Sequence, residues 1–367
     1  MTSDTRPSPE RMQRIVNEAA RQMLEHSKKE QERLARFGHV LPQIVVDAFG
    51  KRLIGVGSRI YSLERCRFFT DFLREYISTI FGKEWFEAEV KKADTERHPL
   101  MQWRLRGLVY MNNQPPQPDG TRAAPPNGAL AGFMSFAYDL YVVDANGRLD
   151  PVLLDRLRHT QLFQGARHEL FAEATCLRAG FTIEREDESD RSSKHAEFTA
   201  THRGTGQKIS VEAKSRHRPG VLGMRGSLQP YEKMSLRFGE LLNSAIRKNP
   251  AYPLVIFLDT NLPARTSEKI LGRCSGADTP ARPMPILEAM LERVRKDHGG
   301  RDPYNCLILT NHPHHYAAPD EVDPKKDMLW IMPLPHMATR PVAHPGALME
   351  LGRAAKLYGN VPMDIEL

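Results

Sequence analysis

Three features are scarce in this sequence of 367 residues, and each scarcity excludes a class of protein. Only four cysteines occur, none spaced as C-x-x-C, which argues against a disulfide framework and a thiolate zinc site and predicts a reducing, cytoplasmic setting. The longest apolar runs, 251–258 and 328–335, are far shorter than the roughly 20 residues that a membrane-spanning helix requires. The first residues are polar and of mixed charge, so we expect no signal peptide.

The composition is that of a globular protein. Hydrophobic residues make up 40% of the chain and charged residues 26%, which excludes a disordered tail and a membrane protein. At roughly 100–200 residues per domain, the length predicts two or three domains.

The positive charge is concentrated in one place. The net charge is +7, and the window 203–250 contains ten Lys and Arg against three acids, so it holds the whole excess. A basic stretch beside a neutral body is typical of a surface that binds polyanions. A solvated helical surface explains the same charge, and the sequence leaves both interpretations open.

Residues 1–160 predict an α-rich N-terminal region of unknown role. Apolar residues at helical spacing predict one helix over 1–37 and an aromatic-rich helix that ends near 82. The segment 112–132 holds five prolines and three glycines, which predicts a loop or linker. Helical patterns resume at 133–143 and 150–160.

Residues 161–335 predict a second domain of the α/β class, with a mixed sheet flanked by helices. Short strand patterns alternate with helical ones in the order α-β-β-β-α-β-α-β, and two of the strands are apolar throughout, as buried strands are. The remaining residues, 336–367, predict a Pro-rich, irregular C-terminal tail.

A hairpin in the second domain carries the chemistry. If the turn RGTG at 203–206 closes symmetrically, the residue numbers of facing pairs add up to 409, so Glu197 faces Glu212. Because side chains alternate along a strand, one face then carries these acids with neighbouring Thr and Ser, and the other is apolar. We expect the apolar face to enter the core and the polar face to point outward.

Two facing carboxylates repel each other unless a cation lies between them. Their hard oxygens suit Mg²⁺, and Lys214 lies on the same face beside Glu212. A metal-bound water together with a lysine that orients it or stabilises negative charge is suited to hydrolysis of a phosphodiester.

This arrangement resembles the PD-(D/E)xK phosphodiesterase superfamily, which has the restriction-endonuclease-like fold. Glu197 matches the first acid, and Glu212-Ala213-Lys214 match the D/E-x-K signature. The preceding helix offers Glu169 and Glu173 as the helix glutamate of the family, and the sequence does not decide between them. Two departures are a Glu in place of the usual Asp as first acid and the absence of a Pro before it.

The resemblance covers about 165–260 and implies an αβββαβ core and a nuclease that cuts DNA with Mg²⁺ or Mn²⁺. It implies catalytic roles for Glu197, Glu212, Lys214 and a helix glutamate, with Glu197, Glu212 and Glu173 as metal ligands. Asp187 or Asp190, in the acidic loop before the hairpin, could supply a ligand instead.

Basic residues near the hairpin are candidates for phosphate contacts. Arg216, Arg218 and Arg225 follow the signature directly and would clamp phosphates or, alternatively, form a plain surface loop. His195 would face Lys214, although a solvated histidine at a strand end is the interpretation we favour.

Three alternatives remain from the sequence. His312, His314 and His315 fit a polar turn better than a zinc site, because no spaced partner ligands occur.

The second domain could be a catalytically inactive module that binds nucleic acid or acts as a scaffold. The N-terminal region could carry a homodimer contact or a protein partner; we expect no membrane association.

Overall fold

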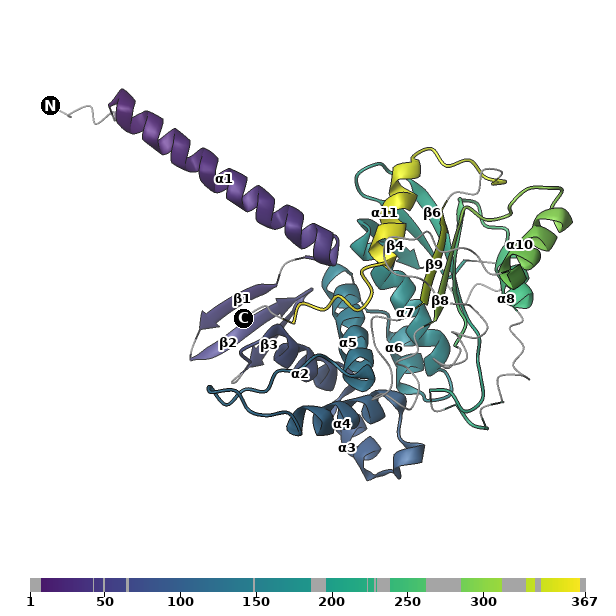
Figure 1. Ribbon diagram of the computed structural model, residues 1–367, viewed down its shortest axis with the longest axis horizontal. Helices are drawn as coiled ribbons and strands as arrows, with labels where there is room; N and C mark the ends of the chain where they lie inside the picture. The colour runs from purple at the N-terminus through teal and green to yellow at the C-terminus, as the bar shows by residue number, and fades with distance from the viewer. Residues whose placement is uncertain are drawn as a thin grey trace.

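We describe a computed structural model of the chain (Figure 1). It describes residues 8–41, 43–48, 50–63, 66–147, 149–185, 196–222, 224–227, 229, 238–261, 285–311, 328–333 and 338–363. The protein is of the mixed α/β class, with a three-stranded and a six-stranded sheet and helices around them. Among the described helices, none combines the length and apolar character needed to cross a membrane.

The N-terminal part contains one long helix, a small antiparallel sheet and a helical bundle. Its elements are α1 (Pro9–Phe37), β1 (Ile44–Ala48), β2 (Lys51–Val56), β3 (Arg59–Leu63), α2 (Phe69–Phe81), α3 (Lys83–Lys91), a short 3₁₀ turn (Asp94–Glu96), α4 (Pro99–Asn112), α5 (Gly128–Asn146) and α6 (Pro151–Arg158). Ser8 caps the start of α1, and Gly38 ends it with a φ of 76°, a conformation that favours glycine.

The predicted loop over 112–132 is wrong at its C-terminal end, because α5 begins at Gly128. The Asn127 side chain accepts a hydrogen bond from the Leu130 amide at 2.9 Å and so caps the helix. The first turn of α5 packs against α4, since a Cβ at Gly107 of α4 would lie 3.5 Å from the Leu130 Cα, an ordinary contact distance.

The second part is built on the six-stranded sheet. Its elements are α7 (Phe163–Arg178), β4 (Phe181–Arg185), β5 (Phe198–His202), β6 (Lys208–Ser215), α8 (Phe238–Ile246), β7 (Leu254–Asp259), α10 (Pro285–Asp297), β8 (Cys306–Asn311), β9 (Met328–Pro333) and α11 (Pro345–Ala355). The strands lie in sequence order; β6, β7 and β8 are parallel, and the other neighbours are antiparallel.

The predicted register of the β5–β6 hairpin is confirmed. Phe198 pairs with Val211 and Thr201 pairs with Lys208, as the symmetric turn requires. The apolar face packs against α7 and α11 in one core, and the opposite face of the sheet packs against α8 and α10 in another. The sheet therefore has helices on both faces.

The prediction of an irregular C-terminal tail is wrong, because α11 forms there and packs against α7. Leu348 and Leu351 are fully buried in the same core as Phe171 of α7. Pro345 occupies the first turn of α11, where a proline costs no hydrogen bond. The high proline content of the tail concealed a short helix whose small apolar residues belong to the sheet core.

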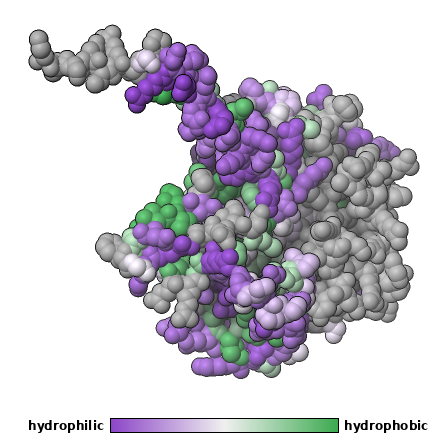
Figure 2. Space-filling model, turned by 60° about the vertical axis from the view of Figure 1, so that its left-hand side comes forward, coloured by the Kyte–Doolittle hydropathy of each residue, from purple (hydrophilic) through white to green (hydrophobic). Residues whose placement is uncertain are grey.

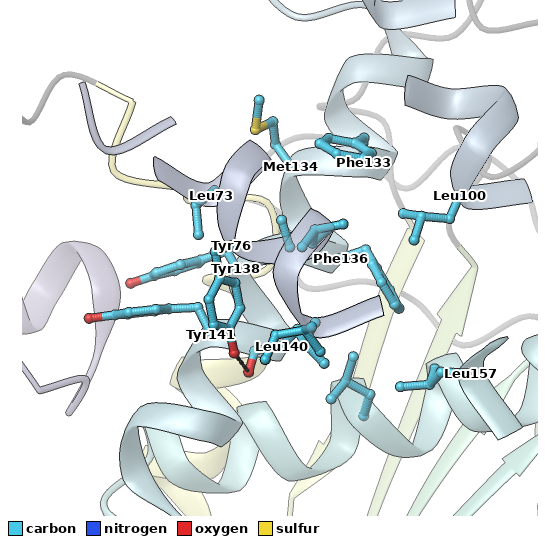
Figure 3. Packing of buried hydrophobic residues seen from close by; sticks show 14 of the residues in the cluster. Leu73, Tyr76, Leu100, Phe133, Met134, Phe136, Tyr138, Leu140, Tyr141 and Leu157 are labelled. Atoms are coloured by element: carbon cyan, nitrogen blue, oxygen red, sulfur yellow. Dashed lines mark hydrogen bonds between the residues drawn. The ribbon is translucent and has the colours of Figure 1, made fainter. Parts of the chain in front are cut away.

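The N-terminal core and the sheet core meet at α7. Aromatic and aliphatic side chains of α2, α4 and α5 form the first core (Figure 3). Phe163, Leu170 and Leu177 of α7 belong to this core, while Phe171 belongs to the sheet core. Almost every residue of α7 is buried as a result.

A charged pair ties α7 to α5 inside this packing. Asp139 lies 3.8 Å from the Arg178 guanidinium, which also lies over the ring of Tyr138 at 4.6 Å. Burial raises the pKa of the Asp139 carboxyl to about 7, although Arg178 and Arg167 act to lower it.

Leu348→Ala should lower the free energy of unfolding by about 2–5 kcal/mol, because it opens a cavity in the sheet core. Met349→Ala is the matched control on the next residue of the same helix; Met349 is 44% exposed, and we expect a change within about 0.5 kcal/mol. Urea unfolding followed by circular dichroism measures both. Equal losses for the two variants would contradict the packing of α11.

Asp139→Asn should change how stability depends on pH. The folded protein binds a proton at Asp139 below about pH 7, whereas the unfolded chain releases it above about pH 4, so this group stabilises the fold less as pH rises between these values. Wild type should therefore gain stability over Asp139→Asn as pH falls from 7 to 5, by up to about 1.4 kcal/mol per pH unit.

Denaturant midpoints at pH 5, 6 and 7 test this, with the exposed Asp155→Asn as control. A difference between wild type and Asp139→Asn that stays constant over this pH range contradicts the burial of an ionisable Asp139.

Candidate functional site

Four charged side chains meet at one end of the β5–β6 hairpin. The Lys214 ammonium lies 2.8 Å from Glu197 Oε1 and 2.8 Å from Glu212 Oε2. The Lys248 ammonium lies 2.9 Å from Glu212 Oε1 and 3.6 Å from Glu197 Oε1. We call Glu197, Glu212, Lys214 and Lys248 the four-charge cluster. It contains equal numbers of acids and ammonium groups.

The cluster lies on a covered face of the sheet, so the expectation that this face points outward is wrong. Glu212 pairs with Ile256 of β7 and Lys214 with Leu258, whose side chains belong to the core beneath α8 and α10. The Glu212 side chain is fully buried, whereas those of Glu197 and Lys214 keep 19% and 18% of their area exposed. Solvent therefore reaches the cluster from the Glu197 side.

Lys248 is the member that the sequence analysis missed. It follows α8, which ends at Ile246, and the packing of α8 on the sheet brings it to Glu212. The signal in the sequence was the basic window around the hairpin, which includes Lys248, but a position beyond a helix end cannot be placed against a strand from spacing alone.

The site shifts the pKa values of Glu197 and Glu212 in opposite directions. Burial acts to raise the pKa of Glu197, but the charges of Lys214 and Lys248 outweigh it and leave this pKa below its ordinary value. Burial raises the pKa of Glu212, and the charge of Glu197 adds to the effect. Burial acts to lower the pKa of Lys214, yet the two carboxylates outweigh it and raise this pKa. Lys214 is therefore a cation at neutral pH.

The two helix glutamates have partners of their own. Glu173 is buried and binds Arg185 of β4 with a shortest contact of 2.5 Å, and Glu169 binds Arg156 of α6 at 2.8 Å. Arg185 faces the α7 side of the sheet, since its strand neighbour Phe198 packs there. The sheet thus separates Glu173 from Glu212, and the structure does not bring Glu173 to the cluster.

Glu169 lies within electrostatic reach of the cluster. Burial raises the pKa of Glu169 to about 7, Arg156 acts to lower it, and the negative charge of Glu197 adds to the rise. Arg156 in turn helps to lower the pKa of Glu197. Of the two helix glutamates, Glu169 is therefore the one whose charge couples to the facing acids.

The arginines after the signature occupy different environments. Arg218 is buried and its Nε donates to the Thr260 carbonyl at 3.0 Å, so its guanidinium points into the protein. Arg216 is half-buried, and Arg225 is exposed in the loop, where its amide donates to the Gln161 side chain. Of the three, Arg225 is the one with a side chain open to a ligand.

Several predicted candidates lie outside the described residues. These are His195, Asp187 and Asp190 before the hairpin, and His312, His314 and His315 after β8. Within the part of the chain that the structure describes, no three His, Cys, Asp or Glu side chains gather closely enough to hold a metal ion. Glu197 and Glu212 are thus the two acids of the four-charge cluster that are available as metal ligands.

Comparison with known proteins adds no relative: no family model matches the chain, and neither the curated proteins nor the solved structures give a match. The resemblance to the PD-(D/E)xK superfamily therefore depends on Glu197, Glu212 and Lys214 themselves and on the order of the elements around them.

Lys248→Met should destabilise the fold by roughly 1–3 kcal/mol, because it leaves the buried Glu212 carboxylate with one ammonium partner in place of two. Arg247→Met is the matched control on the preceding, exposed residue. Adding Glu212→Gln to Lys248→Met should recover part of the loss, since the uncompensated charge disappears. Urea midpoints measure all three; equal midpoints for Lys248→Met and Arg247→Met would contradict the coupling.

Proposed function

We propose that this protein is a metal-dependent nuclease that hydrolyses phosphodiester bonds in DNA. The observation that carries the proposal is the Lys214 ammonium at 2.8 Å from both Glu197, which directly precedes β5, and Glu212 of β6. Two carboxylates and a lysine are suited to phosphodiester hydrolysis with a divalent cation, because the acids can hold the metal and the lysine can stabilise negative charge.

The order of elements around the trio supports the same proposal. The chain runs α7–β4–β5–β6–α8–β7, which is the αβββαβ order implied by the resemblance to the restriction-endonuclease-like fold. The first three strands are antiparallel and β7 joins β6 in parallel. Glu212 and Lys214 lie in the C-terminal half of β6, and Glu197 directly precedes β5.

The acids suit a hard divalent cation. Both oxygens of the buried Glu212 contact ammonium groups, Lys214 at 2.8 Å and Lys248 at 2.9 Å. Such oxygens are the ligands that Mg²⁺ and Mn²⁺ prefer, so Glu197 and Glu212 would hold the metal, with Glu169 the nearer helix glutamate. A bound metal supplies a Lewis acid and an acidified water. It has to compete with at least one lysine, because the cluster is already charge-balanced.

The protein's own residues then have distinct parts. Lys214, protonated at neutral pH, donates hydrogen bonds to the attacking water or a phosphate oxygen rather than removing a proton. Lys248 adds a second positive charge against the negative charge that develops on the phosphate. We expect the exposed Arg225 to contact a neighbouring phosphate of the strand.

The second candidate function is a module that binds nucleic acid, or serves as a scaffold, without cutting. The charge balance of the cluster favours it, because two lysines already neutralise both acids. Glu173 lies on the far side of the sheet, which also favours the module without cleavage. The four-charge cluster is left with two acids, Glu197 and Glu212.

Incubation of the full chain with plasmid, duplex and single-stranded oligonucleotides, with Mg²⁺, Mn²⁺ or EDTA, tests the proposal. We expect metal-dependent cleavage that falls at least about 100-fold in Glu197→Gln, Glu212→Gln and Lys214→Met, the loss typical of removing a group that stabilises the transition state. Lys208→Met, at the exposed end of the same strand, is the matched control and should cleave like wild type.

Two further measurements separate the candidate functions. Mg²⁺ should raise the unfolding temperature of wild type but not of Glu212→Gln, which reports metal binding without turnover. Binding of a labelled duplex without cleavage under any metal condition would instead support the module. Cleavage that survives in all three site variants would overturn the assignment of the site.

A further inference from the structure

The long helix α1 stands apart from the rest of the molecule. Figure 1 shows it projecting from the body, with the three-stranded sheet β1–β3 diverging from the same junction. Large apolar side chains on its N-terminal half are 47% to 73% exposed; they are Met12, Ile15, Val16, Met23 and Leu24. Their spacing places them along one side of the helix, where a water-exposed helix ordinarily carries polar residues.

A second apolar surface covers the outer face of the β1–β3 sheet (Figure 2). Ile44 of β1 and Ile60 of β3 are 68% and 75% exposed, and both lie beside Gly55 of β2. The two isoleucines therefore flank a position of the middle strand that has no side chain, where a Cβ would lie 3.6 Å from the Ile44 Cβ. Val46, 54% exposed, extends the patch along β1.

The junction holds α1 away from its own sheet. The His39 amide donates to the Arg178 carbonyl at 2.7 Å, and Asn360 donates to the Arg36 carbonyl at 3.2 Å. Gly38 has a positive φ, and a Cβ there would lie 2.5 Å from the Arg178 carbonyl oxygen. A backbone packed this closely fixes the direction in which the helix leaves the body, so the two apolar surfaces of one chain stay apart.

The charges on α1 favour a protein as the occupant of its apolar side. Residues 9–25 carry three acids and three arginines, so the segment is neutral, and Glu18 pairs with Arg21 at 2.9 Å. Nucleic acids and anionic lipid surfaces attract segments with an excess of positive charge, which this segment lacks. The whole of α1 carries seven basic residues against five acids, so two copies of the helix repel each other only weakly.

The exposed apolar area matches what a stable dimer needs. The eight side chains of the two surfaces are on average a little over half exposed, and each buries on the order of 100 Å² when fully covered, which gives about 500 Å² per copy. Since roughly 60% of an interface is apolar, this corresponds to about 800 Å² on each partner. Stable interfaces of standard size bury about that much.

We infer that the protein is a homodimer in which α1 of each copy lies on the β1–β3 sheet of the other. Such an exchange covers both apolar surfaces, and a two-fold axis makes the two contacts identical. The apolar side chains of the partner's helix pack on Ile44, Val46 and Ile60. This inference does not depend on the proposed nuclease function, because the contact lies on residues remote from the four-charge cluster.

Sedimentation velocity of the full chain over a range of concentrations tests the dimer. We expect wild type to sediment as a dimer, and both a helix variant (Met23→Glu with Leu24→Glu) and a sheet variant (Ile44→Glu with Ile60→Glu) to weaken dimerisation at least about 30-fold, as loss of central interface side chains does. Lys28→Gln, an exposed position further along α1, is the control and should remain dimeric. Circular dichroism checks that every variant is folded.

Mixing the two variants distinguishes exchange from helix–helix pairing. In the exchanged dimer, the intact helix of the sheet variant still fits the intact sheet of the helix variant, so the mixture should form heterodimers where each variant alone is monomeric. A sheet variant that stays fully dimeric would overturn the exchange, since helices would then pair with each other. A monomeric wild type, with or without binding to anionic phospholipid vesicles, would overturn the homodimer.

Discussion

The burial of α7 is the constraint on which the rest of the structure depends. The helix packs against the N-terminal bundle on one side and against the six-stranded sheet on the other, so its charged residues lie in a medium of low polarity. Unpaired charges cannot be kept there. Each therefore meets an opposite charge on a different element: Arg167 with Asp259, Glu169 with Arg156, Glu173 with Arg185, and Arg178 with Asp139.

These ion pairs position the candidate site as well as the fold. Arg178 and Asp139 fix the bundle against α7, and Arg185 holds Glu173 on the α7 side of the sheet. On the opposite face, the fully buried Glu212 is compensated by two ammonium groups. The sheet therefore separates two sets of buried charges. Glu169 is the acid of α7 whose charge interacts with that of Glu197.

The sequence pattern was sufficient to predict the β5–β6 hairpin, whose conformation depends on neighbouring residues. The symmetric turn and strict alternation of β5 and β6 determined the register, because a slip by one residue would bury the polar set against α7. The same reasoning failed for α5 and α11. Gly128 at the start of α5 and Pro345 in α11 indicate loops by composition, yet both segments become helical because their small apolar residues fill space between other elements.

The candidate site likewise has features that the sequence predicted and features that it did not. Glu197 and Glu212 could be placed near each other from the sequence, because two strands joined by a short turn have a calculable register. The exact facing of the two acids does not hold, since Glu197 precedes β5 and its amide donates to the Val211 carbonyl, one residue out of that register. The sequence did not predict that α8 covers this face, that Lys248 contacts Glu212 or that Glu173 lies on the other side of the sheet. All three features depend on how the helices pack on the sheet.

The sequence by itself determined the class of fold, the hairpin and the proximity of Glu197 and Glu212 to Lys214, since these follow from alternation and turn length within about twenty residues. Tertiary structure alone decided the burial and charge balance of the cluster and the exposure of α1 beside an apolar sheet. The physical reason is that burial is a property of packing between elements distant in sequence, and burial sets both the pKa of a carboxyl group and the availability of an apolar surface.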